Sequence, residues 1–597
     1  MYLSKLKIKN FRAIKDLEIE FKEGVTILVG ENNAGKTTII DALRAILIPA
    51  GGYGAYRLSV DDFTECNTSF DIELTAYMRG LSENDEIALL NSLAYDGDND
   101  IWSQLNLRGV YDVGKNRIKT HFSCGHETAS NTIRGMVDYV DVTYLRPLRD
   151  PSSSLAEGRR SCQAMHITRE LEKNQEAKIA FLEAAKIVNE TMASIPDIAG
   201  IVEKCNAEIM SIVGEEMSQE ISLVFNNPDF FQLISGIKTL IDGKSYFYNG
   251  LGYNNVIEIA MILASRNYTE EGYYLLLIEE PEAHLHPMLQ RLLLTYIQKI
   301  VAKNKEKLQV VITTHSPTFA SKADIANICH VSRVDGEVTC AGFSDVFDEN
   351  AKDDDVLKIN KKKKAKLQRY LDVTRGEIFF TKRVILVEGV AELLLLPVIA
   401  KINGFDLDKN SVTVINCLGL NFEMFVPVLE RLGIRTAIVT DDDEGLYKKD
   451  KNGNYKLTTR SPYSSNLENN TKNLKSVQSF FTHGTFELAL FKSKCLRDLV
   501  LKALSNLGHS TIASGCSELN QQELYKSLFV DGSSIKKGEL AQELAILLEN
   551  EKLNVDESIK EASDENVLKA IHERDAELKE AMPLNVIEAI KYVCGNE

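Results

Sequence analysis

The sequence lacks an apolar run long enough to cross a membrane. Among its 597 residues, no apolar stretch reaches the roughly 20 residues that a transmembrane helix needs. The segment after Met1 is strand-like and rich in lysine, and it lacks the apolar core of a secretory signal. We therefore expect a cytoplasmic protein without a membrane partner. With 44% hydrophobic and 26% charged residues, the chain suits two or three globular domains.

Paired cysteines are also lacking. The ten cysteines are scattered, and none forms a CxxC pair. This spacing argues against a zinc ribbon and against a disulfide framework. It favours the reducing conditions of a cytoplasm.

The chain has no excess of positive charge either. It carries 69 basic and 86 acidic residues, which gives a net charge of −17. A surface for nucleic acid on such a chain needs a local basic track and bound cations. No internal repeat and no long heptad arm is visible, which disfavours a structural tether like those of SMC proteins.

Blocks of strand-like and helical sequence predict five regions. An α/β head is expected at 1–150 and 223–348, interrupted by a helical segment at 151–222 that is rich in Glu, Lys and Ala. A charged run at 349–374 is typical of a solvated linker or helix surface, and a DNA-facing patch is the alternative. In 375–597, strands and helices alternate again, which predicts a second parallel α/β domain with a mostly helical end.

The segment GENNAGKT fits the P-loop pattern GxxxxGK[ST] between a predicted strand and helix. Glycines let successive backbone N–H groups point at phosphate oxygens, and the following helix adds its positive N-terminal end. Lys36 is expected to reach the β- and γ-phosphates of ATP, and Thr37 to bind Mg²⁺. The residues expected to line this nucleotide site are Gly30, Asn32, Asn33, Gly35, Lys36, Thr37 and Thr38.

Two apolar strands downstream end in polar residues that suit the same site. The run LLLIEEP ends with Glu279 and Glu280. We expect Glu279 to hold Mg²⁺ through water and Glu280 to polarise the attacking water. The run LQVVITTH ends with His315, which is placed to contact the γ-phosphate and sense hydrolysis. Adjacent acidic residues are common at strand ends and are weak evidence alone. The order of the P-loop, the acidic pair and the histidine along the chain supports these roles.

A glycine-containing segment, NGLGYNN, precedes the predicted helix 256–264 and carries Gly250 and Gly252. In ABC-type ATPases this position belongs to the signature motif, which caps the nucleotide of a partner subunit. A glycine turn with a helix cap fits the local sequence equally well, and the motif order favours the signature. Since Lys36 and Glu279 lie 243 positions apart, an insertion must split the head.

Acidic residues end two predicted strands of the second domain. Glu388 follows RVILV, and Glu392 lies one helical turn later on the same side. Strand alternation directs Asp441 and Asp443 the same way, although Glu444 leaves this register ambiguous. Carboxyl ends of parallel strands meet at one edge of a sheet, where crowded carboxylates require hard cations. One or two Mg²⁺ ions there would activate water against a phosphodiester.

The motifs GENNAGKTT, NGLGYNN, LLLIEEPEAHLHP and TTHSP resemble the head of the OLD (overcoming lysogenization defect) family. The PEAHLHP run, with Glu282, His284 and His286, is similar to that family's D-loop region. Its HLH spacing admits a metal pair, but we favour a structural and interface role. The YLRPLRD run, with Arg146 and Arg149, is also OLD-like, and a surface turn is its simplest interpretation.

The second domain resembles a Toprim domain, which has a Glu on its first strand and a DxD motif on a later one. Among the additions of the OLD family, HGTFELAL offers Glu487, and SSIKKGELA offers Lys537 as a transition-state lysine, with Lys536 as the alternative. The resemblance implies a site for Mg²⁺, Mn²⁺ or Ca²⁺, with the ligands Glu388, Glu392, Asp441, Asp443 and Glu487.

The resemblance implies an α/β chain in which an ABC-type P-loop ATPase head with a helical, dimerising insertion precedes a Rossmann-like Toprim domain. It implies an ATP-hydrolysing, metal-dependent DNA endonuclease of antiphage defence, a homodimer or higher homo-oligomer whose nucleotide state regulates cleavage. A helicase, or a reverse transcriptase with its noncoding RNA, is an expected partner encoded nearby. The main alternative is a repair ATPase of the recombination-mediator type, which binds DNA without cutting. A second alternative is a topoisomerase or primase-like Toprim activity, and its topoisomerase version needs a catalytic-tyrosine domain, for which no separate stretch is visible.

Overall fold

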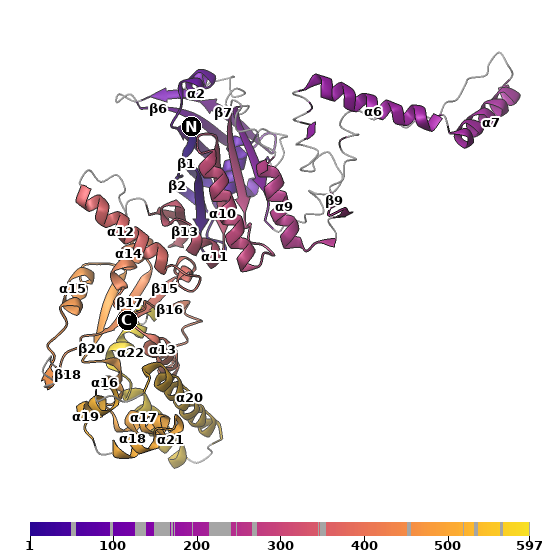
Figure 1. Ribbon diagram of the computed structural model, residues 1–597. Helices are drawn as coiled ribbons and strands as arrows, with labels where there is room; N and C mark the ends of the chain where they lie inside the picture. The colour runs from indigo at the N-terminus through magenta and orange to yellow at the C-terminus, as the bar shows by residue number, and fades with distance from the viewer. Residues whose placement is uncertain are drawn as a thin grey trace. The chain divides into compact units, whose positions relative to one another are not determined.

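The computed structural model divides into two compact units (Figure 1). One unit comprises Met1–Thr26 and Thr37–Thr314, and the other comprises Ile27–Lys36 and His315–Glu597. The residues that the structure describes are 1–48, 55–95, 100–125, 139–147, 167–168, 171, 174–193, 195–213, 234, 240–245, 248–264, 272–343, 346, 354–449, 455–516, 519–530, 535–561 and 565–595.

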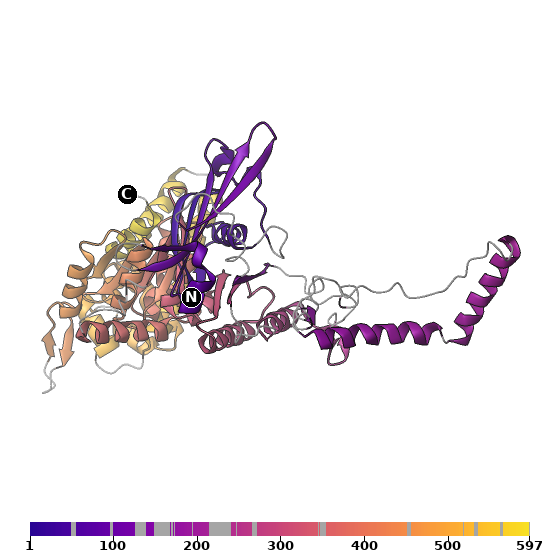
Figure 2. The ribbon, with the colours of Figure 1, turned by 90° about the horizontal axis from the view of Figure 1, so that it is seen from above.

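The N-terminal strands form an antiparallel sheet, drawn in indigo and violet in Figures 1 and 2. Its order is β2-β1-β4-β6-β5, and β7 also pairs with β6. Alternate residues of β4 are buried, as expected of a strand with one face on a core, and β2 buries Ile14, Leu17 and Ile19. The bounds are β1 Tyr2–Phe11, β2 Ile14–Glu20, β4 Ile72–Arg79, β5 Leu93–Tyr95, β6 Ile101–Asp112 and β7 Arg117–Cys124.

A second, mostly parallel sheet has the order β14-β13-β3-β12-β11-β8. Every residue of β3, β11 and β12 is buried, which explains their mostly apolar sequences. Strand β14 pairs antiparallel with β13 at one edge. The bounds are β3 Val25–Val29, β8 Val140–Leu145, β11 Tyr273–Glu279, β12 Leu308–Thr314, β13 Ile328–Val334 and β14 Glu337–Gly342.

The helices predicted after the P-loop and after Gly252 are present in the head, the second with a shifted boundary. Helix α9 begins at Leu251 and not at residue 256, so Gly252 lies in its first turn. The described part of segment 151–222 contains the expected long helices, α6 and α7. The bounds are α1 Lys36–Leu47, α2 Glu83–Ala88, α6 Gln175–Ala193, α7 Pro196–Val213, α9 Leu251–Ala264, α10 Pro287–Lys303 and α11 Pro317–Lys322.

The C-terminal domain is built on a parallel sheet of order β16-β15-β17-β20. Alternate residues of the central strands, such as Ile385, Val387, Ala437 and Val439, share a core with α13, α17, α20 and α22. The bounds are β15 Arg383–Val387, α13 Val390–Ile402, β16 Val412–Asn416, η7 Phe422–Met424, α14 Val426–Leu432, β17 Arg435–Asp441, α15 Pro462–Thr471, β20 Val477–Thr482, α16 Phe486–Leu490, α17 Lys494–Asn506, α20 Lys537–Glu561, α21 Glu565–Glu580 and α22 Leu584–Cys594.

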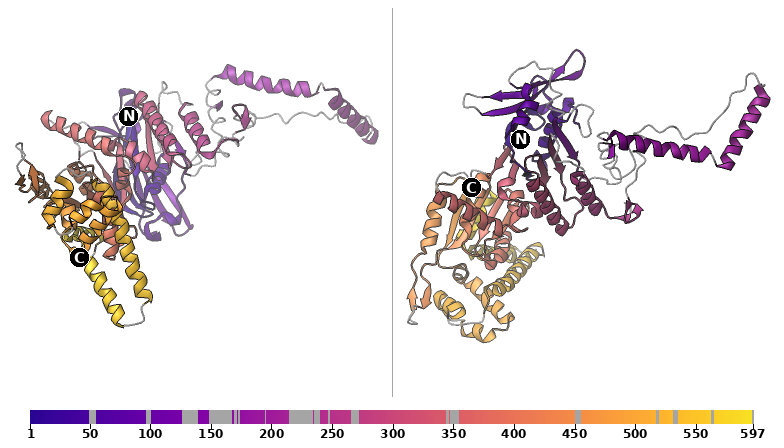
Figure 3. Two further views of the ribbon diagram at one scale, coloured as in Figure 1. Left: turned by 60° about the horizontal axis from the view of Figure 1, so that its bottom comes forward. Right: turned by 45° about the horizontal axis from the view of Figure 1, so that its top comes forward.

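Helices α20 and α21 pack side by side, as the yellow pair in the left view of Figure 3 shows. The charged run expected at 349–374 is helical over α12, Asp354–Tyr370. No helix in the described part of the chain combines the length and apolarity that a membrane span requires.

The structure corrects one expectation drawn from the cysteines. Cys329 and Cys340 form a disulfide between the antiparallel neighbours β13 and β14, with 6.3 Å between their Cα atoms. A single cross-strand pair is not a disulfide framework, but the sequence analysis predicted none. A spacing of 11 residues carries no sequence signal for it, because it depends on the register of the two strands.

Candidate nucleotide and metal sites

The turn between β3 and α1 requires its two glycines. Gly30 has φ +148°, and a Cβ atom there would lie 2.0 Å from the carbonyl oxygen of Val331. Gly35 has φ +113°, and its Cβ would lie 3.0 Å from Val338 Cγ1. Asn33, also in the loop, has φ +62°. Glycine is the residue that adopts such conformations without strain, so the loop backbone stays close to strand β13 and the adjoining β14.

Lys36 is buried and faces back over the P-loop. Its Nζ donates hydrogen bonds to the carbonyl oxygens of Gly30, at 2.6 Å, and Glu31, at 2.7 Å. His315 Nδ1 lies 3.3 Å from the same nitrogen. The two residues predicted to contact the γ-phosphate are therefore neighbours. Asn32 is exposed and Thr38 is half-buried.

Glu279 is the buried acid at the end of β11. Its carboxylate accepts a hydrogen bond from Thr37 Oγ1 at 3.1 Å and another from the Tyr144 hydroxyl at 3.1 Å. Burial and the charge of Asp41 raise the pKa of Glu279 to about 7, although the Tyr144 bond opposes this. A buried carboxylate beside a threonine hydroxyl is a donor set that fits Mg²⁺.

Glu280, the next residue, occupies a conformation that L-residues rarely adopt. Its φ is +44°, and its N–H donates to the carbonyl oxygen of Thr313 at 2.9 Å. The bond ties the end of β11 to the end of β12. A strained residue at a strand end is typical of functional sites, and the half-buried side chain of Glu280 agrees with that.

The two predicted signature glycines have different surroundings. A Cβ on Gly252 would lie 2.3 Å from the carbonyl oxygen of His284, whereas nothing lies within 4 Å of a Cβ on Gly250. Gly252 therefore lets the first turn of α9 pack on the PEAHLHP run. His286 accepts a hydrogen bond from the Met288 N–H at the start of α10, which is the structural role expected for it.

The remaining OLD-like residues are placed as follows. Glu282 Oε1 accepts a hydrogen bond from Thr314 Oγ1 at 2.6 Å. Arg146 is exposed just after β8, and Arg149 lies outside the described residues. Tyr144, within the same YLRPLRD run, is the residue that the sequence analysis overlooked. Its hydroxyl contacts Glu279 directly, whereas the sequence pattern had pointed to the two arginines.

In the C-terminal domain, Glu388 follows strand β15 and Glu392 lies in the first turn of α13. Glu388 Oε2 accepts a hydrogen bond from Thr440 Oγ1 at 3.1 Å. Glu392 is 8% exposed, and its Oε2 accepts a bond from the Gly389 N–H at 3.0 Å. Glu392 thus also caps its own helix. Thr440 carried no sequence signal as a site residue.

The acidic run after β17 divides between two sides. Asp441 lies on the side of Glu388, Glu392 and Glu487, whose charges raise its pKa further after burial. Burial, and then the charge of Asp443, raise the pKa of Glu388. Asp442 faces the other way, and its carboxylate accepts hydrogen bonds from the N–H groups of Glu444 and Gly484. Asp443 has φ +57° and lies after the end of β17, so the alternation expected for an extended strand does not place its side chain.

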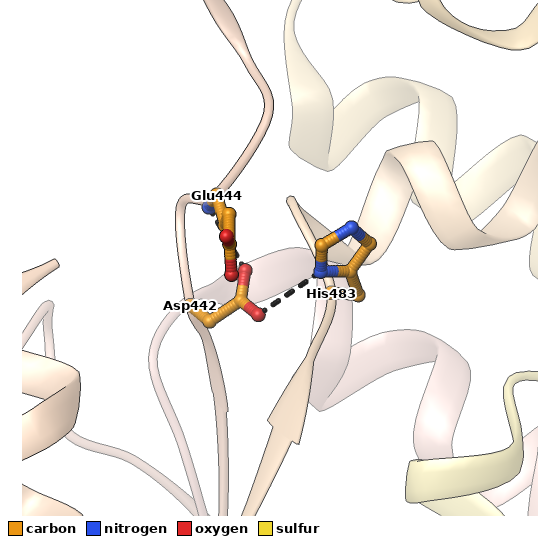
Figure 4. Close-up of side chains that lie close together, drawn as sticks. All are labelled: Asp442, Glu444 and His483. Atoms are coloured by element: carbon orange, nitrogen blue, oxygen red, sulfur yellow. Dashed lines mark hydrogen bonds and ion pairs between the residues drawn. The ribbon is translucent and has the colours of Figure 1, made fainter. Parts of the chain in front are cut away.

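On that other side, Asp442, Glu444 and His483 lie close together (Figure 4). His483 Nδ1 is 3.2 Å from Asp442 Oδ2. The backbone bonds to Asp442 explain this arrangement as a fixed turn between β17 and the end of β20. Glu444 and His483 are exposed.

Glu487 and Lys537 complete the acidic cluster. Glu487, in the first turn of α16, is 6% exposed, and Lys537 Nζ donates to its Oε2 at 2.9 Å. Burial alone would lower the pKa of Lys537, but the charge of Glu487 raises it above its usual value. Lys536 instead pairs with Glu539 at the surface, at 2.7 Å. This placement favours Lys537.

The electrostatics of the cluster fit a divalent cation. Burial, followed by the charges of Glu487, Glu392 and Glu388, raises the pKa of Asp441 well above its usual value. Burial likewise raises the pKa of Glu392 to about 7. Buried carboxylates whose charges act on one another repel, and a hard cation with oxygen ligands relieves that repulsion. Tyr525, whose pKa also responds to Lys537 and Glu487, is a second neighbour that the sequence did not reveal.

Two family models match separate parts of the chain. Residues 1–100 and 127–320 match the AAA ATPase domain family. Residues 379–443 match the TOPRIM domain of overcoming lysogenization defect protein-like proteins. These domains use a nucleotide and a divalent metal. The chain is therefore an α/β protein with an ATPase domain followed by a TOPRIM domain.

Individual relatives extend over most of the chain. An OLD nuclease of Thermus scotoductus is 24% identical over 457 residues, which are 74% of this chain and 82% of the relative. The endonuclease GajA of Bacillus cereus is 25% identical over 479 residues, 76% of this chain and 77% of the relative. The solved C-terminal region of the Burkholderia pseudomallei OLD protein aligns with a TM-score of 0.24 and 18% identity, over 36% of this chain and 98% of that one.

Proposed function

Because this chain belongs to the OLD family, we propose that it is a divalent-metal-dependent DNA endonuclease whose cleavage is regulated by the nucleotide state of its ATPase head. The observation that carries the nuclease half is the gathering of Glu388, Glu392, Asp441 and Glu487 around Lys537. A parallel sheet that collects these acids at the carboxyl ends of its strands has the donor set for two-metal phosphodiester chemistry.

The residues of the cluster divide the chemical work. Mg²⁺ or Mn²⁺, when bound, supplies activated water and charge stabilisation. Asp441, Glu388 and Glu487 would hold it, and Glu392 would take part while also capping α13. Lys537 is the cation of the site and is aimed at the same carboxylates. It is suited to stabilise negative charge that develops on a phosphate in the transition state.

In the head, the proposed roles follow from the contacts of the P-loop. Lys36, Thr37 and the loop amides of residues 30–35 would hold the phosphates and Mg²⁺ of ATP. Glu279 would hold that Mg²⁺, and Glu280 would orient the attacking water. Two P-loops facing two signature segments require at least a homodimer, in which Gly250 and Gly252 would approach the nucleotide of the partner subunit.

One contact supports coupling between nucleotide and cleavage. Lys382 Nζ lies 3.4 Å from a carboxylate oxygen of Glu31, in the P-loop. Lys382 directly precedes β15, the strand that ends at Glu388, and it lines one pocket together with P-loop residues 31–34. A P-loop that changes its position on binding phosphate would therefore act on the strand that carries a metal ligand.

Dimerisation is proposed to use the helical segment 151–222. Its described helices expose apolar side chains, namely Ile179, Ile187, Ile201 and Met210, which are 48–60% exposed. Exposed apolar side chains on neighbouring helices favour burial against another subunit. We expect deletion of this segment to lower the number of subunits in the assembly, measured by light scattering.

The biological setting is proposed from the relatives. A nuclease of this kind would act on invading phage DNA, alone or with a helicase or a reverse transcriptase encoded nearby. The test of the nuclease is nicking of plasmid DNA with Mg²⁺ or Mn²⁺. We expect cutting that Asp441→Ala and excess EDTA both abolish. Metal-independent binding without any cutting would support the repair ATPase instead.

A further inference from the structure

Helix α12 carries the densest positive charge in the chain. Over Asp354–Tyr370 it has seven basic residues and two acidic ones, within a chain whose net charge is −17. Such a helix is either a solvated surface or a binding surface. The contacts that attach it to the fold determine which of its faces is exposed.

One face of α12 is fixed to the protein. Leu367 is fully buried, and Gln368 Nε2 donates to the carbonyl oxygen of Ala323 at 2.7 Å. Gln368 Oε1 accepts the N–H of Ile325 at 3.2 Å. Lys364 pairs with Asp324 at 2.9 Å and is largely covered. These contacts hold α12 rigidly on the segment after α11 and fix which side of the helix faces solvent.

The opposite face presents a row of cations, which we call the basic stripe. Lys358, Lys362, Lys366 and Arg369 follow one another at spacings of four, four and three, so they lie on one side of the helix. All four are exposed. Lys358 pairs with Asp355 at 3.6 Å. Within the described residues, no ion pair is recorded for Lys362, Lys366 or Arg369.

The basic stripe belongs to the same unit as the acidic cluster. Helix α12 packs beside η7, which follows strand β16. In the loop before η7, the N–H of Gly419 donates to the carbonyl oxygen of Glu388 at 2.8 Å. The loop and η7 therefore connect helix α12 to Glu388, which is one of the carboxylates of the acidic cluster. In Figure 1, α12 is the salmon-coloured helix of this region.

We propose that the basic stripe of α12 docks the phosphate backbone of DNA and so delivers the strand to the acidic cluster. The inference rests on the proposed nuclease function and names the surface that holds its substrate. From Lys358 to Arg369 the stripe spans about 16 Å at 1.5 Å per residue, a length over which duplex DNA presents many phosphates. An acidic cluster repels DNA, so a row of exposed cations on the same unit supplies the attraction that cleavage requires.

The test is DNA binding measured apart from cutting. Anisotropy of a labelled duplex is followed with the full chain in EDTA over a series of salt concentrations. The variant is K362Q/K366Q/R369Q, and the control is K409Q/K502Q/K591Q, which removes the same charge from scattered exposed positions. Each lost phosphate contact flattens the plot of log affinity against log salt by about 0.9. We expect the stripe variant to lose roughly 2 to 3 in slope and at least tenfold in affinity at low salt.

The outcomes separate this inference from the nuclease. Equal binding by the stripe variant and its control overturns the stripe, even where wild type cuts DNA. Loss of binding in the stripe variant alone supports the stripe, even where wild type never cuts and the nuclease proposal fails. A polyglutamate chain that displaces DNA at equal charge concentration assigns the surface to acidic polypeptides and overturns the inference. An unchanged melting temperature and unchanged ATP turnover without DNA establish that the variant is folded.

Discussion

Replacing Asp441 with Asn tests whether the acidic cluster is a metal site or a structural feature. The substitution keeps the size of the side chain and removes one negative charge. Asp441 is the member of the cluster whose pKa is raised by burial and then by three other carboxylates, Glu487, Glu392 and Glu388. In metal-free protein that charge destabilises the fold. In metal-loaded protein the same charge stabilises it.

The size of this destabilisation can be estimated from the pKa shift of a neighbouring carboxylate. The pKa of Glu392 is raised from 4.5 to about 7. A raised folded-state pKa gives stability that is complete below the unfolded value and lost as pH rises through the folded value. One pKa unit corresponds to about 1.4 kcal/mol. As the pH rises from 4.5 to above 7, ionisation of Glu392 alone therefore lowers the free energy of unfolding of the metal-free protein by about 3 kcal/mol. Removing one neighbouring charge should recover about 1 to 2 kcal/mol, or roughly 2–8 °C in Tm for a domain of this size.

The assay is thermal melting near pH 5 and near pH 8, in EDTA and in Mn²⁺. In EDTA at the higher pH, we expect Asp441→Asn to melt above wild type. In Mn²⁺ the order should reverse, because wild type gains the binding energy of the metal. Glu539→Gln, at an exposed position of α20, should leave both orders unchanged. The metal-site argument fails if Asp441→Asn melts below wild type in EDTA and Mn²⁺ leaves the wild-type Tm unchanged.

Three further predictions address the other groups of the two sites. Lys537→Met should lower the rate of plasmid cleavage about 10²-fold or more and should keep the metal-dependent shift in Tm. Lys536→Met should cleave at the wild-type rate, and an equal loss of cleavage in both variants would contradict the choice of Lys537. Glu280→Gln should bind ATP, release no phosphate, and change the cleavage rate; cutting at the wild-type rate at every ATP concentration would show uncoupled domains. Lys382→Glu should change the effect of ATP on cutting about two- to fivefold, since an exposed ion pair contributes about 1 kcal/mol or less, and adding Glu31→Lys should restore it. No restoration would remove that pair from the coupling.

Much of the fold could be predicted because its signals are local. Helix α10, Pro287–Lys303, has local boundary signals, because His286 caps its start and Pro287 occupies its first turn. The fully buried strands β11 and β12 carry the apolar runs Leu275–Ile278 and Val310–Ile312, and the P-loop conformation depends on its glycines. Each of these features follows from residues close together in the sequence.

What could not be predicted depends on contacts between distant segments. Tyr144 reaches Glu279 across 135 positions, and Thr440 reaches Glu388 across 52, and nothing near either residue marks it as part of a site. The start of α9 was missed because Gly252 lowers the helical propensity of its first turn, whereas close packing on His284 favours glycine there. Tertiary packing overrides local propensity in this turn.

The run Asp441-Asp442-Asp443 shows how one strand end serves two purposes. Asp441 faces the carboxylates of the cluster, and Asp442 lies on the opposite side. There, Asp442 accepts the N–H groups of Gly484 and Glu444, and its own N–H donates to the carbonyl oxygen of Thr482. These bonds fix the end of β20 just before α16, the helix that holds Glu487. The middle aspartate is thus a positioning residue, because it sets the place of a carboxylate that it never touches.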